Sequence, residues 1–306
     1  MEDLYRRSVL GIAGSGPVQR LIERYGFRFG VGRFVAGESL DEALAVVAGL
    51  HSQGYTSILD LLGEFVDSRD AVDDIVQSIL VTLDSLAAAG PERHMSVKPT
   101  QLGLGIDYGL ALGNATAIAD RAVRAGVHLC LDMENHPYTD QTLELFTELQ
   151  ERGLSEVSTV LQSYLHRSEA DLEHMAGRFP QARVRLVKGA YREPAEVASH
   201  DPAVIRRNFL AMLENALAAG MHVAVATHDE KLIEASLQRI RSAGAGARYE
   251  FQLLYGIKPR LQSRLLAEGQ PVRIYVPYGR DWYGYFSRRL AERPANLAVV
   301  ARGMFG

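Results

Sequence analysis

Short apolar runs rich in β-branched and aromatic residues alternate along this chain with segments of helical periodicity. Eight runs have the length and composition of strands, at 55–62, 94–99, 127–134, 158–164, 184–189, 222–228, 249–254 and 273–277. Helical patterns lie between and after them, at 70–89, 114–125, 142–152, 168–178, 202–219, 231–241, 259–267 and 282–291. Eight strands alternating with eight helices predict an α/β fold, a (β/α)₈ barrel of the TIM type. A doubly wound parallel sheet is the alternative.

Polar residues and glycines mark the ends of several predicted helices. We expect Ser168 and Asp201 to open two helices as caps, and Gly126, Gly220 and Gly269 to follow three others. These boundaries agree with the apolar periodicity.

Residues 1–53 precede the first predicted strand and contain helical patterns at 18–25 and 40–51. We expect them to form an N-terminal helical flank that covers the bottom or side of the barrel. The catalytic barrel then occupies 54–306, in one structural domain overall. The glycine-rich stretch 103–113 is predicted to be an irregular loop.

Composition narrows the class of protein. Of 306 residues, 47% are hydrophobic and 23% charged, which is ordinary for a globular protein, and the net charge of −4 gives no electrostatic case for nucleic-acid binding. Cys130 is the single cysteine, and we expect a buried, inert thiol. No apolar run has the roughly 18–20 residues that span a bilayer, and no targeting sequence is recognisable. We expect a cytoplasmic protein, with peripheral contact at the inner face of the membrane left open.

Nearly every predicted strand ends on polar or ionisable residues. In a barrel of this type the catalytic groups lie at the carboxyl ends of the strands. Burying so many charges would cost several kcal/mol each unless they were paired. We therefore expect an enzyme site built from these strand ends: Asp60 and Glu64, Lys98, Asp132 and Glu134, Gln162, Arg185 and Lys188, His228 and Asp229, Gln252 and Tyr275.

Each of these residues also has a purely structural interpretation. Lys98 could form an ion pair with Asp132 at the barrel rim, Gln162 could be a satisfied core amide, and Glu64 could begin a helix. A metal role for His228 is poorly supported, because a metal site usually needs three convergent ligands and no second histidine ends a neighbouring strand. We predict no metal site.

Two cations three residues apart, Arg185 and Lys188, are followed by Gly189. This arrangement suits an anionic or electron-rich cofactor that the backbone approaches closely. No G-x-G-x-x-G sequence opens a βαβ unit, so a dinucleotide would not bind in the Rossmann manner.

The last predicted helix carries Tyr285, Arg288 and Arg289 at i, i+3 and i+4, which places them on one face. A phenol and two guanidiniums can clamp a small carboxylate that has an apolar body, because the guanidinium fork binds a carboxylate through two parallel bonds. The alternative is a solvated helix face.

Several motifs together resemble the proline dehydrogenase family, flavoenzymes with a (β/α)₈ barrel. The chain looks like the short single-function bacterial form and is similar to the proline dehydrogenase domain of bifunctional proline utilisation proteins. The resemblance spans 61–292 in the family's order. Its motifs are Leu61-Leu62-Gly63-Glu64, Ser96-Val97-Lys98, Asp132-Met133-Glu134, Val160-Leu161-Gln162-Ser163-Tyr164, Arg185-Leu186-Val187-Lys188-Gly189-Ala190-Tyr191, Ala226-Thr227-His228, Phe251-Gln252-Leu253-Leu254-Tyr255-Gly256 and Tyr285-x-x-Arg288-Arg289-Leu290-x-Glu292.

The resemblance implies non-covalent FAD and the oxidation of L-proline to Δ1-pyrroline-5-carboxylate, the first step of proline catabolism to glutamate. It also implies a quinone-type electron acceptor, and a separate pyrroline-5-carboxylate dehydrogenase is a possible partner. The oligomeric state is not implied.

Roles for individual residues follow from the same resemblance. Lys98, Arg288 and Arg289 are expected to hold the proline carboxylate, and Leu254, Tyr275 and Tyr285 to surround its ring. Asp132 and Arg185 are the expected catalytic residues, and Glu64 is expected to form a gate with Arg288. The expected cofactor-binding residues are Met133, Gln162, Arg185, Val187, Lys188, Gly189, Ala226, Thr227 and His228.

Two rival functions remain open from the residues alone. A Schiff-base aldolase would use Lys188 as its amine. A non-catalytic barrel would bind an amino acid without turning it over.

Overall fold

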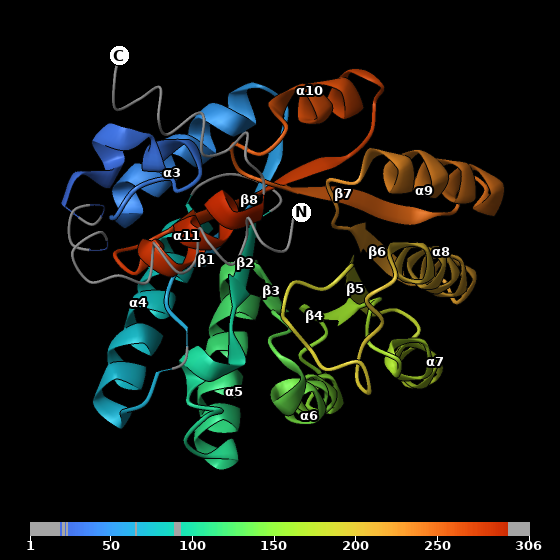
Figure 1. Ribbon diagram of the computed structural model, residues 1–306. Coiled ribbons are helices and arrows are strands. Elements are labelled where there is room, and N and C mark those ends of the chain that lie inside the picture. Colours follow the sequence, from blue (N-terminus) through green and yellow to red (C-terminus); the bar gives the residue numbers. More distant parts are fainter. Residues whose placement is uncertain (1–18, 20–21, 23, 65, 89–92, 293–306) are drawn as a thin grey trace.

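Eight parallel strands form a closed barrel in the computed structural model, which describes residues 19, 22, 24–64, 66–88 and 93–292 (Figure 1). The strands follow sequence order: β1 (Thr56–Leu61), β2 (Arg93–Val97), β3 (His128–Leu131), β4 (Val157–Gln162), β5 (Arg183–Val187), β6 (His222–Val225), β7 (Arg248–Leu254) and β8 (Val272–Tyr278). Pairing of β1 with β8, in which Ser57 lies opposite Ile274, closes the sheet. The barrel prediction is confirmed, and closure excludes the doubly wound sheet.

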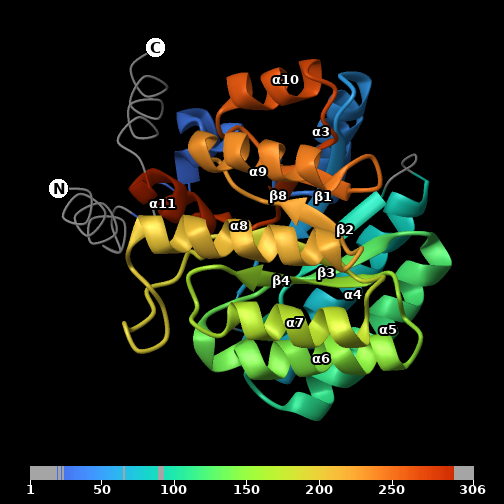
Figure 2. The same cartoon turned by 90° about the vertical axis from the view of Figure 1, so that its right-hand side faces the viewer.

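Helices surround this barrel (Figures 1 and 2). They are α3 (Leu40–Ser52), α4 (Arg69–Ala87), α5 (Tyr108–Ala125), α6 (Thr139–Glu151), α7 (Ser168–Arg178), α8 (Pro202–Ala218), α9 (Glu230–Ala243), α10 (Pro259–Ala267) and α11 (Trp282–Glu292). Short 3₁₀ turns lie at Gly26–Phe29 (η1), Val31–Arg33 (η2), Pro99–Leu102 (η3) and His136–Tyr138 (η4). Helix α11 contributes Tyr285, Arg288, Arg289 and Ala291 to the lining of a cavity at the end of the barrel.

The N-terminal expectation is tested only in part. The helix predicted at 40–51 corresponds to α3, which lies beside β1 and β8. Half of the residues in the pattern at 18–25 fall outside the described residues, and the division into a flank and a barrel domain stays a prediction. Cys130 is buried, as expected.

Helix ends show where local sequence decides the structure. Asp201 caps α8 by accepting a hydrogen bond from the Ala203 N–H at 2.8 Å. Gly126 ends α5 in the left-handed conformation, with φ of 64°. The predicted cap at Ser168 is wrong: Ser168 is already the first helical residue, and its hydroxyl instead donates to the Gln162 carbonyl at the end of β4.

The loop predicted at 103–113 is also wrong over much of its length. Helix α5 begins at Tyr108, six residues before the predicted start at 114, because Asp107 caps it by accepting from the Leu110 N–H at 2.8 Å. Glycines at positions 109 and 113 interrupt the apolar periodicity without ending the helix. Strand β6 ends at Val225, so the predicted strand at 222–228 is too long.

Apolar packing fixes α11 over the barrel. Trp282 and Phe286 on α11 are buried with Phe34 from the N-terminal segment, and the Phe286 ring centroid lies 5.9 Å from that of Trp282 and 6.1 Å from that of Phe34. The Trp282 indole N–H also donates to Glu38 at 2.8 Å. Because one face of α11 is anchored in this way, its other side chains are held toward the barrel.

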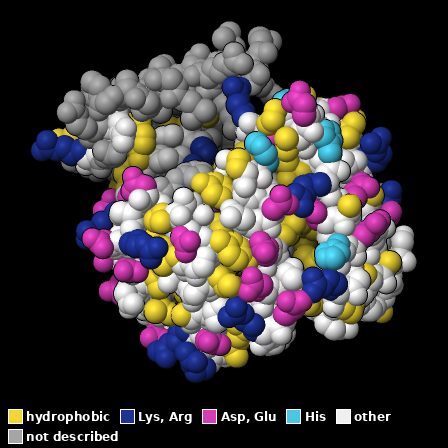
Figure 3. Space-filling model, turned by 90° about the horizontal axis from the view of Figure 1, so that it is seen from below, with side chains coloured by type: hydrophobic (Ala, Val, Ile, Leu, Met, Phe, Trp, Pro, Cys, Tyr) yellow, Lys and Arg dark blue, Asp and Glu magenta, His cyan; other side chains and the backbone are white. Residues whose placement is uncertain are grey.

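Charged side chains of both signs are interspersed on the face seen in Figure 3. Nothing drawn in colour there forms a large cationic patch of the kind that binds nucleic acid. Among the helices of the described part of the chain, none has the length and apolarity to cross a bilayer.

Candidate functional site

A cavity of about 1500 Å³ lies at the carboxyl ends of the strands, between the barrel and α11. All the site residues expected from the sequence line it: Glu64, Lys98, Asp132, Met133, Gln162, Arg185, Val187, Lys188, Gly189, Ala226, Thr227, His228, Leu254, Tyr275, Tyr285, Arg288 and Arg289. The structure therefore brings these residues together, whereas their individual roles stay predictions.

Asp132, directly after β3, is the centre of a polar network. One of its carboxylate oxygens accepts from Arg185 at 2.6 Å and from the Ser96 hydroxyl at 2.9 Å, and the other accepts from the Tyr275 hydroxyl at 2.7 Å. Burial raises the pKa of Asp132, but Arg185 and Lys98 outweigh this and hold the pKa below its usual range. Asp132 is therefore an anion that orients the groups around it.

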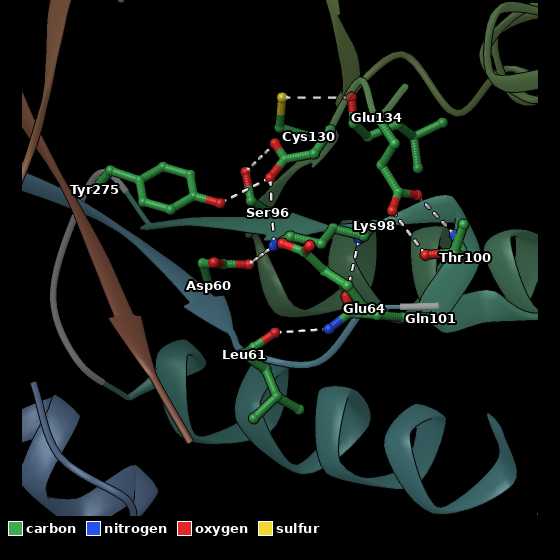
Figure 4. A network of polar contacts seen from close by, with 12 residues as sticks. Asp60, Leu61, Glu64, Ser96, Lys98, Thr100, Gln101, Cys130, Glu134 and Tyr275 are labelled. Carbon is green, nitrogen blue, oxygen red and sulfur yellow. Dashed lines mark hydrogen bonds and ion pairs between the residues drawn. The ribbon is translucent and has the colours of Figure 1, made fainter. Parts of the chain in front are cut away.

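Lys98 lies between two carboxylates. Its ammonium is 2.6 Å from Asp60 at the end of β1 (Figure 4). It is 3.7 Å from Asp132. Burial lowers the pKa of Lys98, yet the two carboxylates outweigh it and raise the pKa above its usual value. Burial in turn raises the pKa of Asp60. A buried amine that stays protonated can attract a ligand carboxylate.

Helix α11 faces this network across the cavity. Arg288 donates to the Glu64 carboxylate, from the loop after β1, at 2.7 Å. The Arg289 guanidinium lies 5.1 Å from the centre of the Tyr285 ring. Two guanidiniums and one ammonium thus border the same cavity, a charge arrangement suited to an anionic group.

Three buried polar atoms at the cavity wall have no hydrogen-bond partner among the described residues. They are the side-chain oxygens of Gln162 and Gln252 and the Nε of Arg185. Buried groups of this kind are normally paired, so these atoms indicate a ligand with both donors and acceptors. The pyrimidine edge of a flavin, which carries an N–H and two carbonyls, has that chemistry.

A second cationic region lies further along the cavity, near the start of α9. Asp229 caps α9 and binds both Arg206, at 2.9 Å, and Lys188, at 3.5 Å. Lys258, which adopts a left-handed backbone with φ of 48°, forms an ion pair with Glu230. The cations and the helix start suit a diphosphate. The residues present therefore fit the chemistry of FAD.

The imidazole of His228 is oriented by the backbone. Its Nε2 accepts a hydrogen bond from the Leu254 N–H at 3.0 Å, so the neutral ring carries its proton on Nδ1. The preceding residues, Ala226 and Thr227, also line the cavity. The imidazole is therefore held in one orientation at the cavity wall, between β6 and β7.

Sequence reasoning assigned no role to several residues that line the cavity. Asp60, Glu134 and Gln252 were visible as strand ends, whereas Ala190 and Tyr191 lie in a loop whose path no local pattern specifies. Burial raises the pKa of Glu134 to about 7, although Thr100 donates two hydrogen bonds to its carboxylate. Within the described ranges, no three His, Cys, Asp or Glu side chains are arranged to hold a metal ion.

Comparison with known proteins gives the family. A family model described as proline dehydrogenase matches residues 43–302. The chain is 42% identical to a proline dehydrogenase of Deinococcus radiodurans over 309 residues, covering 99% of each chain. It is 36% identical to proline dehydrogenase 2 of Bacillus subtilis, covering 96% of this chain and 97% of that relative. The chain belongs to the proline dehydrogenase family.

Solved structures agree with this assignment. Proline utilization A from Bdellovibrio bacteriovorus, in a form inactivated by N-propargylglycine, has a TM-score of 0.81 at 25% identity and covers 94% of this chain. The chain spans 36% of that longer protein. Proline utilization A from Bradyrhizobium japonicum, at 21% identity and a TM-score of 0.73, shares the fold. The family resemblance seen in the motifs is confirmed.

Proposed function

We propose that this protein catalyses the FAD-dependent oxidation of L-proline to Δ1-pyrroline-5-carboxylate and passes the electrons to a quinone-type acceptor. Family membership supports the oxidation of proline. The unpaired polar atoms of Gln162, Gln252 and Arg185, together with the cations near α9, support FAD. When bound, FAD would supply the two-electron acceptor for the reaction.

The substrate carboxylate is held, in this proposal, by Lys98, Arg288 and Arg289. Lys98 is buried and stays protonated through its contact with Asp60. Because the three cations are on a barrel rim and a separate helix, they can hold the carboxylate from two sides and orient the ring. Leu254, Tyr275 and Tyr285 provide an apolar surround matched to the methylene groups of proline.

Asp132 and Arg185 act as a fixed pair that sets the electrostatics of the site. The pair is held at 2.6 Å, and Tyr275 donates to the same carboxylate. Since all the contacts of Asp132 stabilise its anion, we propose that it positions Arg185 and Tyr275 rather than accepting the proton of the substrate amine. Arg185 would stabilise negative charge as electrons leave the substrate.

The ion pair between Glu64 and Arg288 acts as the gate. Its two side chains, 14% and 34% exposed, come from the loop after β1 and from α11. An ion pair between these segments would cover the bound ring and exclude water from the reacting carbon.

The arrangement of Lys98 and the α11 arginines around one cavity is the observation that carries this proposal. To test it, purified protein supplied with FAD is examined by visible spectroscopy, and L-proline is then added without oxygen. We expect oxidised-flavin bands that bleach with proline, and an imine product that an aminobenzaldehyde reagent traps. A colourless protein that stays inactive with added FAD would contradict the proposal.

The same preparation separates the rival functions. Lys188 is 43% exposed and lies 3.5 Å from Asp229, whereas the lysine of a Schiff-base enzyme is typically enclosed in an apolar pocket or beside another cation. Inactivation by borohydride with substrate would indicate an aldolase, and binding of proline without flavin bleaching would indicate a binding protein.

A further inference from the structure

The side chain of Gln101, in the η3 turn after β2, bridges two of the loops that form the cavity. Its amide N–H donates to the Leu61 carbonyl at 2.7 Å, and its amide oxygen accepts from the Lys98 backbone N–H at 2.9 Å (Figure 4). The partners fix the orientation of the amide, because an N–H can contact only the oxygen and a carbonyl can contact only the nitrogen. Gln101 is fully buried, although it does not line the cavity.

The two bridged residues lead to two different parts of the site. Leu61 is the last residue of β1 and stands three residues before Glu64, which pairs with Arg288. Lys98 is the first residue after β2 and carries the buried ammonium. One amide therefore ties the loop that carries the gate carboxylate to the residue that is placed to hold a ligand carboxylate.

Neighbouring contacts make this bridge rigid. The Gln101 N–H donates to the Lys98 carbonyl at 2.9 Å, so main chain and side chain of Gln101 both bind Lys98. The preceding turn residue, Thr100, donates to the Glu134 carboxylate through both its backbone N–H and its hydroxyl. Gly63 also lies against this side chain, since a Cβ built there would come within 3.6 Å of the Gln101 amide nitrogen.

We propose that Gln101 is a positioning residue that couples closure of the Glu64–Arg288 gate to the placement of Lys98. When a ligand carboxylate moves the Lys98 side chain and its backbone, the amide transmits the shift to Leu61 and so to the gate loop. Without the amide, the Lys98 N–H and the Leu61 carbonyl would be left buried and unpaired, and each loop would relax separately. This inference rests on the proposed function, because it takes the gate and the substrate grip as given.

A double-mutant cycle tests the coupling. Gln101→Met has similar volume and removes both amide contacts, whereas Glu64→Ala removes the gate carboxylate. We expect each single variant to raise KM for L-proline about tenfold with kcat within about threefold of the unsubstituted protein. We expect the double variant to stay within about threefold of the weaker-binding single variant, because both changes break one device. Full multiplication of the two effects, or a KM of Gln101→Met within twofold of the unsubstituted value, would overturn the proposal.

Two further variants distinguish a specific role of the Gln101 amide from a general loss of structure. Gln101→Glu keeps an acceptor for the Lys98 N–H and loses the donor to the Leu61 carbonyl. Its KM should therefore lie between that of the unsubstituted protein and that of Gln101→Met. A KM as high as that of Gln101→Met would agree with the bridge, and an unchanged KM would exclude it. The matched control is Gln150→Met, because Gln150 on α6 likewise donates its amide to a strand carbonyl, that of Val157 at 2.6 Å, but lies outside the cavity. Its KM should not change.

Binding of the cyclic ether analogue of proline, tetrahydrofuran-2-carboxylate, is measured by calorimetry on the same variants. This ligand needs no turnover, so the cycle can be read from dissociation constants. If the protein binds the analogue but does not oxidise proline, the proposed function fails while the coupling is still measured. If the unsubstituted protein binds neither this analogue nor L-proline, both proposals are overturned.

Discussion

The two ends of the barrel interior both contain buried charges, yet they differ in space and in pairing. At the amino-terminal end, Arg273 binds the Glu250 carboxylate at 2.9 and 3.0 Å and the Ser57 carbonyl at 3.0 Å. The void that Glu250 lines there has a volume of only about 10 Å³. At the carboxyl-terminal end, Lys98 and Asp132 border a cavity of about 1500 Å³. Buried charge alone therefore does not identify a site, whereas buried charge facing open space does.

The side chains of Arg185 and Gln252 lie between the two regions. The amide N–H of Gln252 donates to Glu250 at 2.6 Å, while its amide oxygen has no partner in the part of the chain that the structure describes. The contact with Glu250 at the amino-terminal end thus fixes the orientation of the Gln252 amide oxygen, which faces the cavity at the carboxyl-terminal end. The comparison predicts that removing Arg273 at the amino-terminal end lowers stability, whereas removing a cation of α11 at the carboxyl-terminal end weakens substrate binding.

The largest effect is expected at the amino-terminal end. Arg273→Met leaves the Glu250 carboxylate buried without its cation, so the free energy of unfolding should fall by about 3–5 kcal/mol while KM for proline changes little. Urea unfolding and steady-state kinetics measure the two quantities. Adding Glu250→Gln should recover part of the loss, and a variant with full stability would contradict the account.

The matching change at the carboxyl-terminal end is Arg288→Met or Arg289→Met. Each should lower kcat/KM for proline by about 2–5 kcal/mol in transition-state terms, mainly through KM, because a carboxylate in a closed site loses a charged partner. Stability should change by less than about 1 kcal/mol. Arg264→Met is the control, since Arg264 pairs with Glu234 on the outer surface. A normal KM in both site variants would remove the clamp from the account.

Glu134 provides a test through pH. Its pKa is about 7 in the folded protein against an ordinary value of 4.5, so the folded state favours the protonated acid. Its contribution to stability is complete below about pH 4.5 and is lost as pH rises toward 7. Glu134→Gln should therefore reduce the difference in unfolding free energy between pH 5 and pH 8 by about 1–3 kcal/mol. An unchanged pH dependence in urea unfolding would show that this carboxyl is not perturbed.

The smallest effect is expected for Asp60→Asn. Removal of this carboxylate takes away a main cause of the raised pKa of Lys98, while burial continues to lower it. The ratio of variant to unsubstituted KM for proline should then rise by about three- to tenfold from pH 6.5 to 9. Asp84→Asn, at an exposed pair with Arg121, serves as the control. A ratio that stays flat with pH would show that Asp60 does not keep Lys98 charged.

Much of the fold and of the candidate site can be predicted from the sequence, because the patterns that specify them are local. The barrel follows from periodicity, and the strand ends follow from the barrel, so Lys98, Asp132 and Arg185 could be placed in one cavity. The start of α5 could not be predicted, because glycines interrupt the apolar periodicity in the first turns after the Asp107 cap. The bridge made by Gln101 could not either, since its two partners are 40 and 3 residues away.

The difference between the two ends of the barrel interior could not be predicted from the sequence either. Arg273 and Glu250 are strand residues of the same chemical types as Arg185 and Asp132, and only the folded barrel shows that Glu250 lines the small void and Asp132 the large cavity. Residue type predicts that a buried charge needs a partner, but whether that partner is a protein group or a ligand depends on the space around it.

The most direct test of the account is a crystal structure of the FAD-loaded protein with tetrahydrofuran-2-carboxylate. The account predicts that the ligand carboxylate contacts Lys98 and the arginines of α11, with the ring against Tyr275 and Tyr285. A ligand whose carboxylate lies away from both Lys98 and α11 would contradict it.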